Sequence, residues 1–168
     1  MITIRTMHPD EVDAVCRVDR EAFRSSRFGA LTGLQDRAPE EFEQWQSVHD
    51  FRAYCTRHPD RVLVAVEDDR IAGFAIFDYS EEEQAGRVYS CALLPAFRGR
   101  GTGVSLVKRL IEELRARGAR RAEVRTTHVP RACRMYEKAG FELVERRTKQ
   151  ADDGTHYDCS RYQIDLSR

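Results

Sequence analysis

The sequence predicts a mixed α/β domain, of the α+β type, in which six to seven mostly antiparallel strands form a central sheet flanked by about four helices. Short β-branched runs alternate along the chain with segments of helical periodicity. Short polar turns join the central strands, which favours antiparallel pairing between them. A length of 168 residues suits one domain covering residues 1–168.

The N-terminal third predicts one strand and two helices. Residues 2–5 alternate in polarity as a strand does, and a helical apolar pattern begins near Asp10. Two glycines break the segment 25–33, which predicts a loop. Pro39 suits the first turn of a second helix. The apolar stripe of that helix either packs in the core or lines a substrate pocket, and it consists of Phe42, Trp45, Val48 and Phe51.

The centre of the chain predicts three antiparallel strands. Residues 62–66 form a dense β-branched run, which is typical of a buried strand. Residues 71–77 and 87–94 have similar patterns, and polar turns at 67–70 and 81–86 separate the three strands. Pro95 follows the third strand and ends it, because proline cannot donate to the ladder.

The C-terminal part predicts two helices and three strands. A helix with its buried stripe over residues 104–114 ends at Gly118, and a short helix from Pro130 ends at Gly140. The strands are expected at residues 122–126, 141–144 and 157–166, with a turn at 149–154 before the last of them.

Composition and charge exclude several classes of protein. Residues 1–94 carry a net charge of −7, residues 95–134 of +8 and residues 135–168 of −1. A basic segment in a neutral chain indicates a local anionic ligand or a solvated arginine-rich helix face, and it does not favour nucleic acid.

No apolar run approaches the ~18 residues that span a bilayer, and no signal peptide is evident, so a cytoplasmic protein without membrane contact is expected. The five scattered cysteines lack metal-site spacing and predict free thiols without a metal.

The strongest chemical signal is a loop in which Gly99, Gly101 and Gly103 alternate between an apolar strand and an amphipathic helix. Glycine lets a ligand approach the backbone, and the start of a helix directs free N–H groups and a positive dipole end toward that ligand. The loop therefore predicts a phosphate site, to which Arg98 and Arg100 add positive charge. Its spacing matches neither the dinucleotide fingerprint nor the Walker loop.

Residues 93–103 (LLPAFRGRGTG) resemble the acyl-CoA motif of the GNAT superfamily of N-acetyltransferases. Arg98, Gly101 and Gly103 meet the family pattern Arg/Gln-x-x-Gly-x-Gly/Ala. Residues 132–141 are similar to the family segment Ala-x-x-x-Tyr-Glu-Lys-x-Gly-Phe. The order of helices and strands also agrees, so the resemblance covers nearly the whole chain.

The resemblance implies a cofactor motif over about residues 88–141, with acceptor-side elements at about 8–58 and 142–168. It implies that acetyl-CoA is the acyl donor, that the strand end at Leu93 and Leu94 pairs with its pantetheine arm, and that Ala132 lines the cofactor. Backbone amides of the loop would hold the pyrophosphate, and they belong to Gly99, Arg100, Gly101, Thr102, Gly103 and Val104.

The resemblance also implies that Tyr136 is the general acid. Attack of an amine on a thioester expels a thiolate, and protonating that thiolate eases the collapse of the intermediate. A phenol, whose pKa is about 10, can donate this proton while remaining neutral at pH 7. A core tyrosine on a short helix is the structural alternative.

One position departs from the family, and the general base is not evident. The family often has Asn seven residues before the tyrosine, where this chain has Val129, and the chain contains no Asn. His128 could replace it or could lie at the surface. Four residues are candidates for the base, with a water chain as an alternative, and they are Asp78, Glu81, His156 and Asp158.

Together these patterns predict an acetyl-CoA-dependent N-acetyltransferase that acts by direct attack of a primary amine on the thioester. The acceptor is a small amine or a peptide N-terminus, and the acidic N-terminal half suits a cationic one. The alternative is a non-catalytic acyl-CoA-binding sensor or partner module. Nucleic acid is not expected as a partner, because the basic segment lacks interleaved aromatic residues. The resemblance also favours a homodimer.

Overall fold

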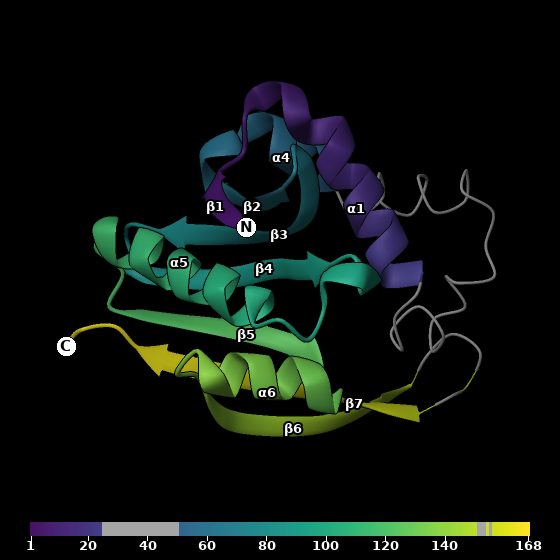
Figure 1. Ribbon diagram of the computed structural model, residues 1–168. Helices are drawn as coiled ribbons and strands as arrows, with labels where there is room; N and C mark the ends of the chain where they lie inside the picture. Colours follow the sequence, from purple (N-terminus) through teal and green to yellow (C-terminus); the bar gives the residue numbers. More distant parts are fainter. Residues whose placement is uncertain (25–50, 151–153, 155) are drawn as a thin grey trace.

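The computed structural model describes residues 1–24, 51–150, 154 and 156–168. Within these ranges the chain forms one seven-stranded sheet with helices on both of its faces (Figure 1). The predicted loop at 25–33 and nearly all of the predicted helix at 39–51 lie outside the described residues. The mixed α/β fold class predicted from the sequence is confirmed.

The strands follow the order β1–β2–β3–β4–β5–β7–β6 across the sheet. Neighbours are antiparallel except β4 and β5, which are parallel because the helix between them returns the chain to the starting edge of β4. The strands are β1 (Thr3–Thr6), β2 (Val62–Glu67), β3 (Arg70–Ser80), β4 (Ala85–Leu93), β5 (Arg121–Thr127), β6 (Glu142–Gln150) and β7 (His156–Asp165).

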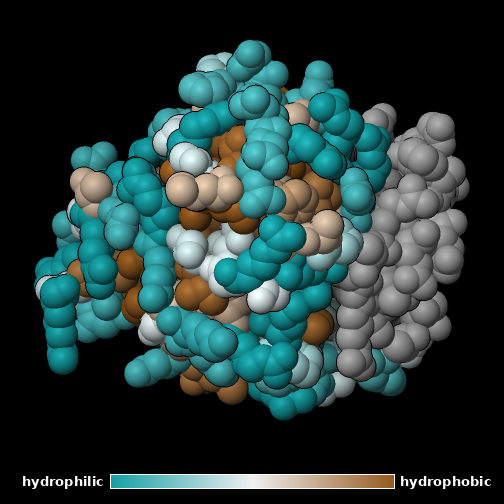
Figure 2. All heavy atoms as spheres, in the orientation of Figure 1, coloured by the Kyte–Doolittle hydropathy of each residue, from teal (hydrophilic) through white to brown (hydrophobic). Residues whose placement is uncertain are grey.

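Two helices cover each face of the sheet in the described part of the chain. They are α1 (Val12–Arg24), α4 (Phe51–Arg57), α5 (Thr102–Ala116) and α6 (Pro130–Lys138). Figure 1 shows α5 and α6 crossing the near face. Hydrophilic side chains cover most of that side of the molecule, and hydrophobic ones show between them in small separate areas (Figure 2). None of the described helices is long and apolar enough to cross a membrane.

The core consists of two clusters, one on each face of the sheet. Leu63 and Ala65 of β2 pack in the cluster under α5 and α6, while Val62 and Val64 pack in the cluster under α1 and α4. Because side chains alternate along a strand, both faces of β2 are buried. This double burial explains why the strand has a continuous apolar run instead of an alternating pattern.

The end of β6 differs clearly from the sequence prediction. β6 extends to Gln150, beyond the expected end at residue 144, because it pairs with β7 as far as the rung between Gln150 and His156. Eight of its nine residues are exposed, so no apolar pattern marks it. Of the predicted apolar stripe only Phe51 is described, and it is buried in α4.

An ion pair holds the turn between β1 and α1. The Arg5 guanidinium donates to Glu11 Oε1 at 2.7 Å and to Oε2 at 2.9 Å, and the His8 amide donates to Oε2 at 2.8 Å. These hydrogen bonds, above all the one from Arg5, lower the pKa of Glu11 to about 2.

Replacing Glu11 by glutamine should lower the free energy of unfolding at pH 7 by about 1 kcal/mol, a modest value because solvent screens the partly exposed pair. Because the pKa of Glu11 is lower in the folded protein than its ordinary value of 4.5, the ionised carboxylate stabilises the fold at pH values above 4.5. That stabilisation is lost as the pH falls toward 2. Urea unfolding at pH 7 and pH 3 should therefore show a smaller difference from the wild type at pH 3. The matched control is Glu112→Gln on the exposed side of α5. If Glu11→Gln lowered the free energy of unfolding equally at pH 7 and pH 3, the stabilising role of the ionised Glu11 would be contradicted.

Candidate active site

The strands β4 and β5 pair over only part of their length and then diverge (Figure 1). Residues 85–88 pair with residues 121–124, and β4 continues beyond this ladder to Leu93. Ile76 of β3 lies opposite Ser90 and Phe77 lies opposite Val88, so Tyr89 is an extra residue on β4. Such a bulge bends the strand, while β4 stays paired with β3 on both sides of it. The second half of β4 therefore has an open backbone edge toward β5.

The orientation of this open edge follows from one hydrogen bond. The Leu94 amide donates to Ala72 O of β3 at 2.9 Å, so Leu94 faces away from β5. Because backbone groups alternate in direction along a strand, the N–H groups of Cys91 and Leu93 face the gap. An extended ligand arm in the gap could therefore pair with β4 as a strand would.

The glycine loop leads from the end of β4 into α5. Gly99 and Gly101 have φ angles of +78° and +82°, which side chains rarely adopt. The sequence suggested that Gly103 belongs to the loop. The helix begins at Thr102, however, so Gly103 lies in the first turn of α5. The Ser105 amide donates to Gly101 O at 3.0 Å. The amides of residues 102–104 precede this first helical bond and have no acceptor in the part of the chain that the structure describes.

Gly103 brings the start of α5 against α6. A Cβ atom at this position would lie 2.6 Å from Met135 Sδ and 3.4 Å from Leu93 Cδ1. The glycine therefore permits close packing between α5, α6 and the end of β4, and this packing fixes the position of the amides relative to α6. Sequence analysis assigned Gly103 to ligand approach alone and did not predict this packing.

The two arginines of the loop have different roles in the structure. Arg98 is half-buried, and it donates from Nε to Leu93 O at 3.0 Å and from Nη2 to Ala22 O at 3.1 Å. Burial lowers its pKa, and the charge of Arg131 adds to the effect. Arg98 thus fixes the loop to β4 and α1, whereas the sequence suggested only that it adds positive charge to the phosphate site. Arg100 is exposed beside the loop, its guanidinium carbon lies over the Phe97 ring at 5.5 Å from the centroid, and its Nη1 pairs with Glu67 at 3.4 Å.

Tyr136 is buried on α6, with 4% of its surface exposed, and its ring packs edge-on against Phe141. Burial raises its pKa well above the usual value of 10, and the thiols of Cys91 and Cys133 act in the same direction. Cys91 and Leu93, from the open half of β4, pack against the core cluster that contains Tyr136. Its hydroxyl has no hydrogen-bond partner among the described residues. The phenol is therefore protonated at neutral pH and can donate a proton to a ligand.

Three of the remaining residues predicted to contact the cofactor lie on the helices that border this gap, whereas Leu94 binds β3 through its amide and packs in the cluster under α1 and α4, away from the gap. Leu94 is buried at the end of β4, and Thr102 is buried in the first turn of α5. Val104 and Ala132 are half-buried, Val104 in the first turn of α5 and Ala132 in the first turn of α6. The two helices thus contribute three residues to one region of the molecule.

The position of the family asparagine is occupied by Val129, which caps α6 without a side-chain hydrogen bond. His128 is half-buried. Its Nδ1 contacts Ser160 Oγ and lies 3.6 Å from Cys133 Sγ, and its amide donates to Asp158 O at 2.6 Å. These contacts connect His128 to β7 and α6, so Nδ1 already has partners within the protein.

The structure does not bring the four candidate bases to Tyr136. Asp78 accepts from Arg61 Nη1 at 2.6 Å, and Asp158 accepts from Thr148 at 2.8 Å. The Thr148 bond and the Arg146 bond lower the pKa of Asp158. Glu81 lies in the exposed β3–β4 turn, and His156 is exposed at the start of β7.

All five cysteines are free thiols, as predicted. Burial raises the pKa of Cys91 to about 12, so this thiol near Tyr136 stays protonated and is a poor nucleophile. Across residues 1–24, 51–150, 154 and 156–168, no cluster of three or more His, Cys, Asp or Glu side chains could hold a metal ion.

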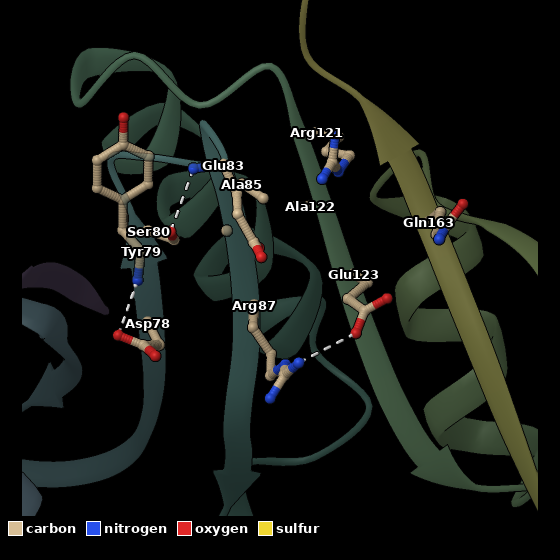
Figure 3. A pocket seen from close by; sticks show the side chains of 11 residues that line it. Asp78, Tyr79, Ser80, Glu83, Ala85, Arg87, Arg121, Ala122, Glu123 and Gln163 are labelled. Atoms are coloured by element: carbon tan, nitrogen blue, oxygen red, sulfur yellow. Dashed lines mark hydrogen bonds and ion pairs between the residues drawn. The ribbon is translucent and has the colours of Figure 1, made fainter.

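Sequence analysis did not predict a small hollow on the sheet face opposite α5. Figure 3 shows it between the end of β3 and strands β4, β5 and β7, with the helices behind the sheet. Its volume is about 220 Å³, and its lining includes Arg87, Glu123 and Gln163. Arg87 Nη2 lies 3.5 Å from Glu123 Oε1, across the junction of β4 and β5.

Comparison with known proteins explains this arrangement. A model of the acetyltransferase (GNAT) family matches residues 28–141. The chain belongs to the GNAT family of acetyltransferases. The family resemblance predicted from the loop and from the Tyr136 segment is thereby confirmed, and this GNAT protein is an acyltransferase.

Curated relatives and solved structures agree with the family. An N-acetyltransferase of Archaeoglobus fulgidus, itself uncharacterized, is 30% identical over 142 residues, which are 79% of this chain and 88% of the relative. The N-acetyltransferase from Staphylococcus aureus superposes with a TM-score of 0.74 at 21% identity and covers 99% of both chains. An N-acetyltransferase from Thermoplasma acidophilum, solved in complex with coenzyme A, has a TM-score of 0.70 at 15% identity and covers 98% of this chain and 99% of its own. These structures share the fold of the GNAT protein described here.

Proposed function

We propose that this GNAT protein transfers an acetyl group from acetyl-CoA to a primary amine by direct attack of the amine on the thioester. One observation carries the proposal: the open half of β4, the first turn of α5 and the helix that bears Tyr136 meet at one place, where Gly103, Met135 and Leu93 pack together. The coenzyme A complex of the Thermoplasma acidophilum structure supports the choice of donor. Residues 1–168 would act as one catalytic domain.

The donor site uses backbone groups for most of its contacts. The amides of residues 102–104, together with the positive end of α5, suit the diphosphate of coenzyme A. Arg100 adds an exposed positive charge, while Arg98 holds the loop in place. The Leu93 N–H faces the gap and would pair with the pantetheine arm. Acetyl-CoA supplies the activated acetyl group when it is bound.

Tyr136 completes the transfer. The amine nitrogen forms a bond to the thioester carbon, and the bond from that carbon to sulfur breaks. The Tyr136 hydroxyl gives its proton to the departing sulfur, and the tyrosine regains a proton from solvent. The amine loses its surplus proton to water. Because the pKa of Tyr136 is raised, the tyrosine holds its proton until the thiolate forms.

The acceptor is a small amine or the N-terminus of a peptide. A relative from Haemophilus influenzae, 34% identical over 87 residues, is named for the N-acetylation of alanine in ribosomal protein bS18. That stretch is 51% of this chain and 57% of the relative. The relative therefore supports the acetylation of an amine and does not identify the acceptor of this chain.

A thiol-release assay with acetyl-CoA and a panel of amines and peptides tests the proposal. Turnover should depend on the amine, and mass spectrometry should show one acetyl group added to it. Calorimetry on the same preparation should show that acetyl-CoA binds. Binding of acetyl-CoA without turnover on any amine would indicate a non-catalytic acyl-CoA module and contradict the proposal.

A further inference from the structure

The sheet face opposite α5 and α6 carries more arginines than carboxylates where β4 and β5 separate. Arg87 pairs in register with Glu123, Arg125 with Arg161, and Arg161 with Glu145, so these side chains share one face. Val88 and Val124, the neighbours of Arg87 and Arg125, point to the opposite cluster under α5. Arg147 of β6 adds a fourth guanidinium, and it pairs with Glu145. Four cations thus surround two carboxylates, an excess of two positive charges among these six residues.

The excess is concentrated at Arg87 and Arg125. Arg161 contacts both carboxylates, with distances of 3.8 Å to Glu123 and 3.3 Å to Glu145. Arg87 and Arg125 have only one carboxylate partner between them, Glu123, at 3.5 Å and 4.0 Å. Their side chains are 62% and 70% exposed, so most of their N–H donors are open to a ligand. A guanidinium binds carboxylates through paired donors, which makes both residues suitable anion partners.

These two arginines lie beside the reaction site proposed above. The rung between Val88 and Val124 is the last one between β4 and β5. Arg87 precedes that rung on β4, and Arg125 follows it on β5, so the two side chains lie on opposite sides of the point where the gap opens. Figure 3 shows Arg87 reaching from β4 across to Glu123 on β5.

The adjacent hollow indicates the size of the ligand. Arg87 and Glu123 form part of its lining, and its volume is about 220 Å³. This volume is below the ~300–1,000 Å³ that is typical of sites for drug-sized ligands. The hollow lies at the paired end of β4 and β5, beside Arg87, and its lining also includes Arg121 and the carboxylates of Asp78 and Glu83. It therefore suits only a small ligand that reaches Arg87.

We propose that Arg87 and Arg125 bind a carboxylate of the acceptor, so that the substrate class is a small primary amine that carries a carboxylate, such as an amino acid. This inference rests on the proposed function. It replaces the cationic acceptor that the acidic N-terminal half suggested. Three carboxylates of that half already have cationic partners, since Glu11 pairs with Arg5, Asp13 with Arg52 and Asp78 with Arg61.

The test compares amino acids with their amides, which lack the carboxylate charge. L-Glutamate, L-methionine and β-alanine, each beside its amide, are assayed at saturating acetyl-CoA. Wild-type kcat/KM should be at least about tenfold higher for the best acid than for its amide, as expected for a charge-assisted contact. Arg87→Gln and Arg125→Gln should each raise the KM for the acid about tenfold and leave the KM for the amide unchanged.

The matched control is Arg109→Gln, which removes an exposed arginine on the other face of the sheet and should leave both constants unchanged. Calorimetry should show unaltered acetyl-CoA binding in all three variants. A preference for amides or for spermidine would overturn this inference and leave the proposed function in place. Equal losses on acids and amides in the Arg87 and Arg125 variants would also overturn it. If no amine of any charge releases thiol, both proposals fail together.

Discussion

Tyr136→Phe should lower kcat at least about tenfold, because a general acid contributes about 10²–10⁴-fold and water can replace part of that effect. The fold should survive, since phenylalanine keeps the edge-on contact with Phe141 and the hydroxyl has no partner among the described residues. Binding of coenzyme A should change little by calorimetry, because the proposed donor contacts are backbone amides of α5. Steady-state kinetics on the acceptor from the thiol-release screen measures the loss.

Tyr162→Phe is the matched control for this experiment. Tyr162 is fully buried, its ring centroid lies 6.3 Å from that of Tyr136, and its hydroxyl donates to Glu137 Oε1 at 2.9 Å. Losing that bond should reduce stability while kcat remains near the wild-type value. An unchanged kcat in Tyr136→Phe would show that Tyr136 is not the acid. Equal losses of kcat in both variants would assign the effect to packing.

Gly101→Val should weaken coenzyme A binding at least about tenfold, because a branched side chain would cover the amides at the start of α5. A Cβ atom at Gly101 has no neighbour within 4 Å, so the free protein has room for the side chain. The substitution destabilises the free protein only through the φ of +82°, which a β-branched residue rarely adopts. That backbone strain costs about 1–2 kcal/mol. Calorimetry with coenzyme A measures the change in affinity.

Gly118→Val separates backbone strain from ligand binding. Gly118 has a φ of +91° just beyond the opposite end of α5, far along the helix from Gly101. Its substitution should lower the melting temperature as Gly101→Val does and leave the affinity for coenzyme A unchanged. Wild-type affinity in a folded Gly101→Val protein would refute the assignment of the loop.

The elements that sequence analysis predicted well are those with local signals. β2 to β4 have dense apolar runs separated by polar turns, and α5 has a clear buried stripe. β6 has almost no buried residue, so only its register with β7 defines its length. The segment 25–50 lies outside the described residues, and the predictions made for it stay predictions.

The site shows the same contrast between local and long-range signals. The glycine loop and the Tyr136 segment are continuous motifs, so the sequence alone indicated both. The packing of Gly103 against Met135 and the fixing of Arg98 by Ala22 depend on contacts between distant segments. The pairing of Arg87 with Glu123 likewise depends on the register of β4 against β5, which no local pattern reveals.

A crystal structure with acetyl-CoA bound is the most direct test of the site. We expect diphosphate oxygens within hydrogen-bond distance of the amides of residues 102–104. We also expect the pantetheine arm between β4 and β5, and the sulfur close to the Tyr136 hydroxyl. A cofactor bound on another surface, or a gap filled by the protein's own side chains, would contradict this assignment.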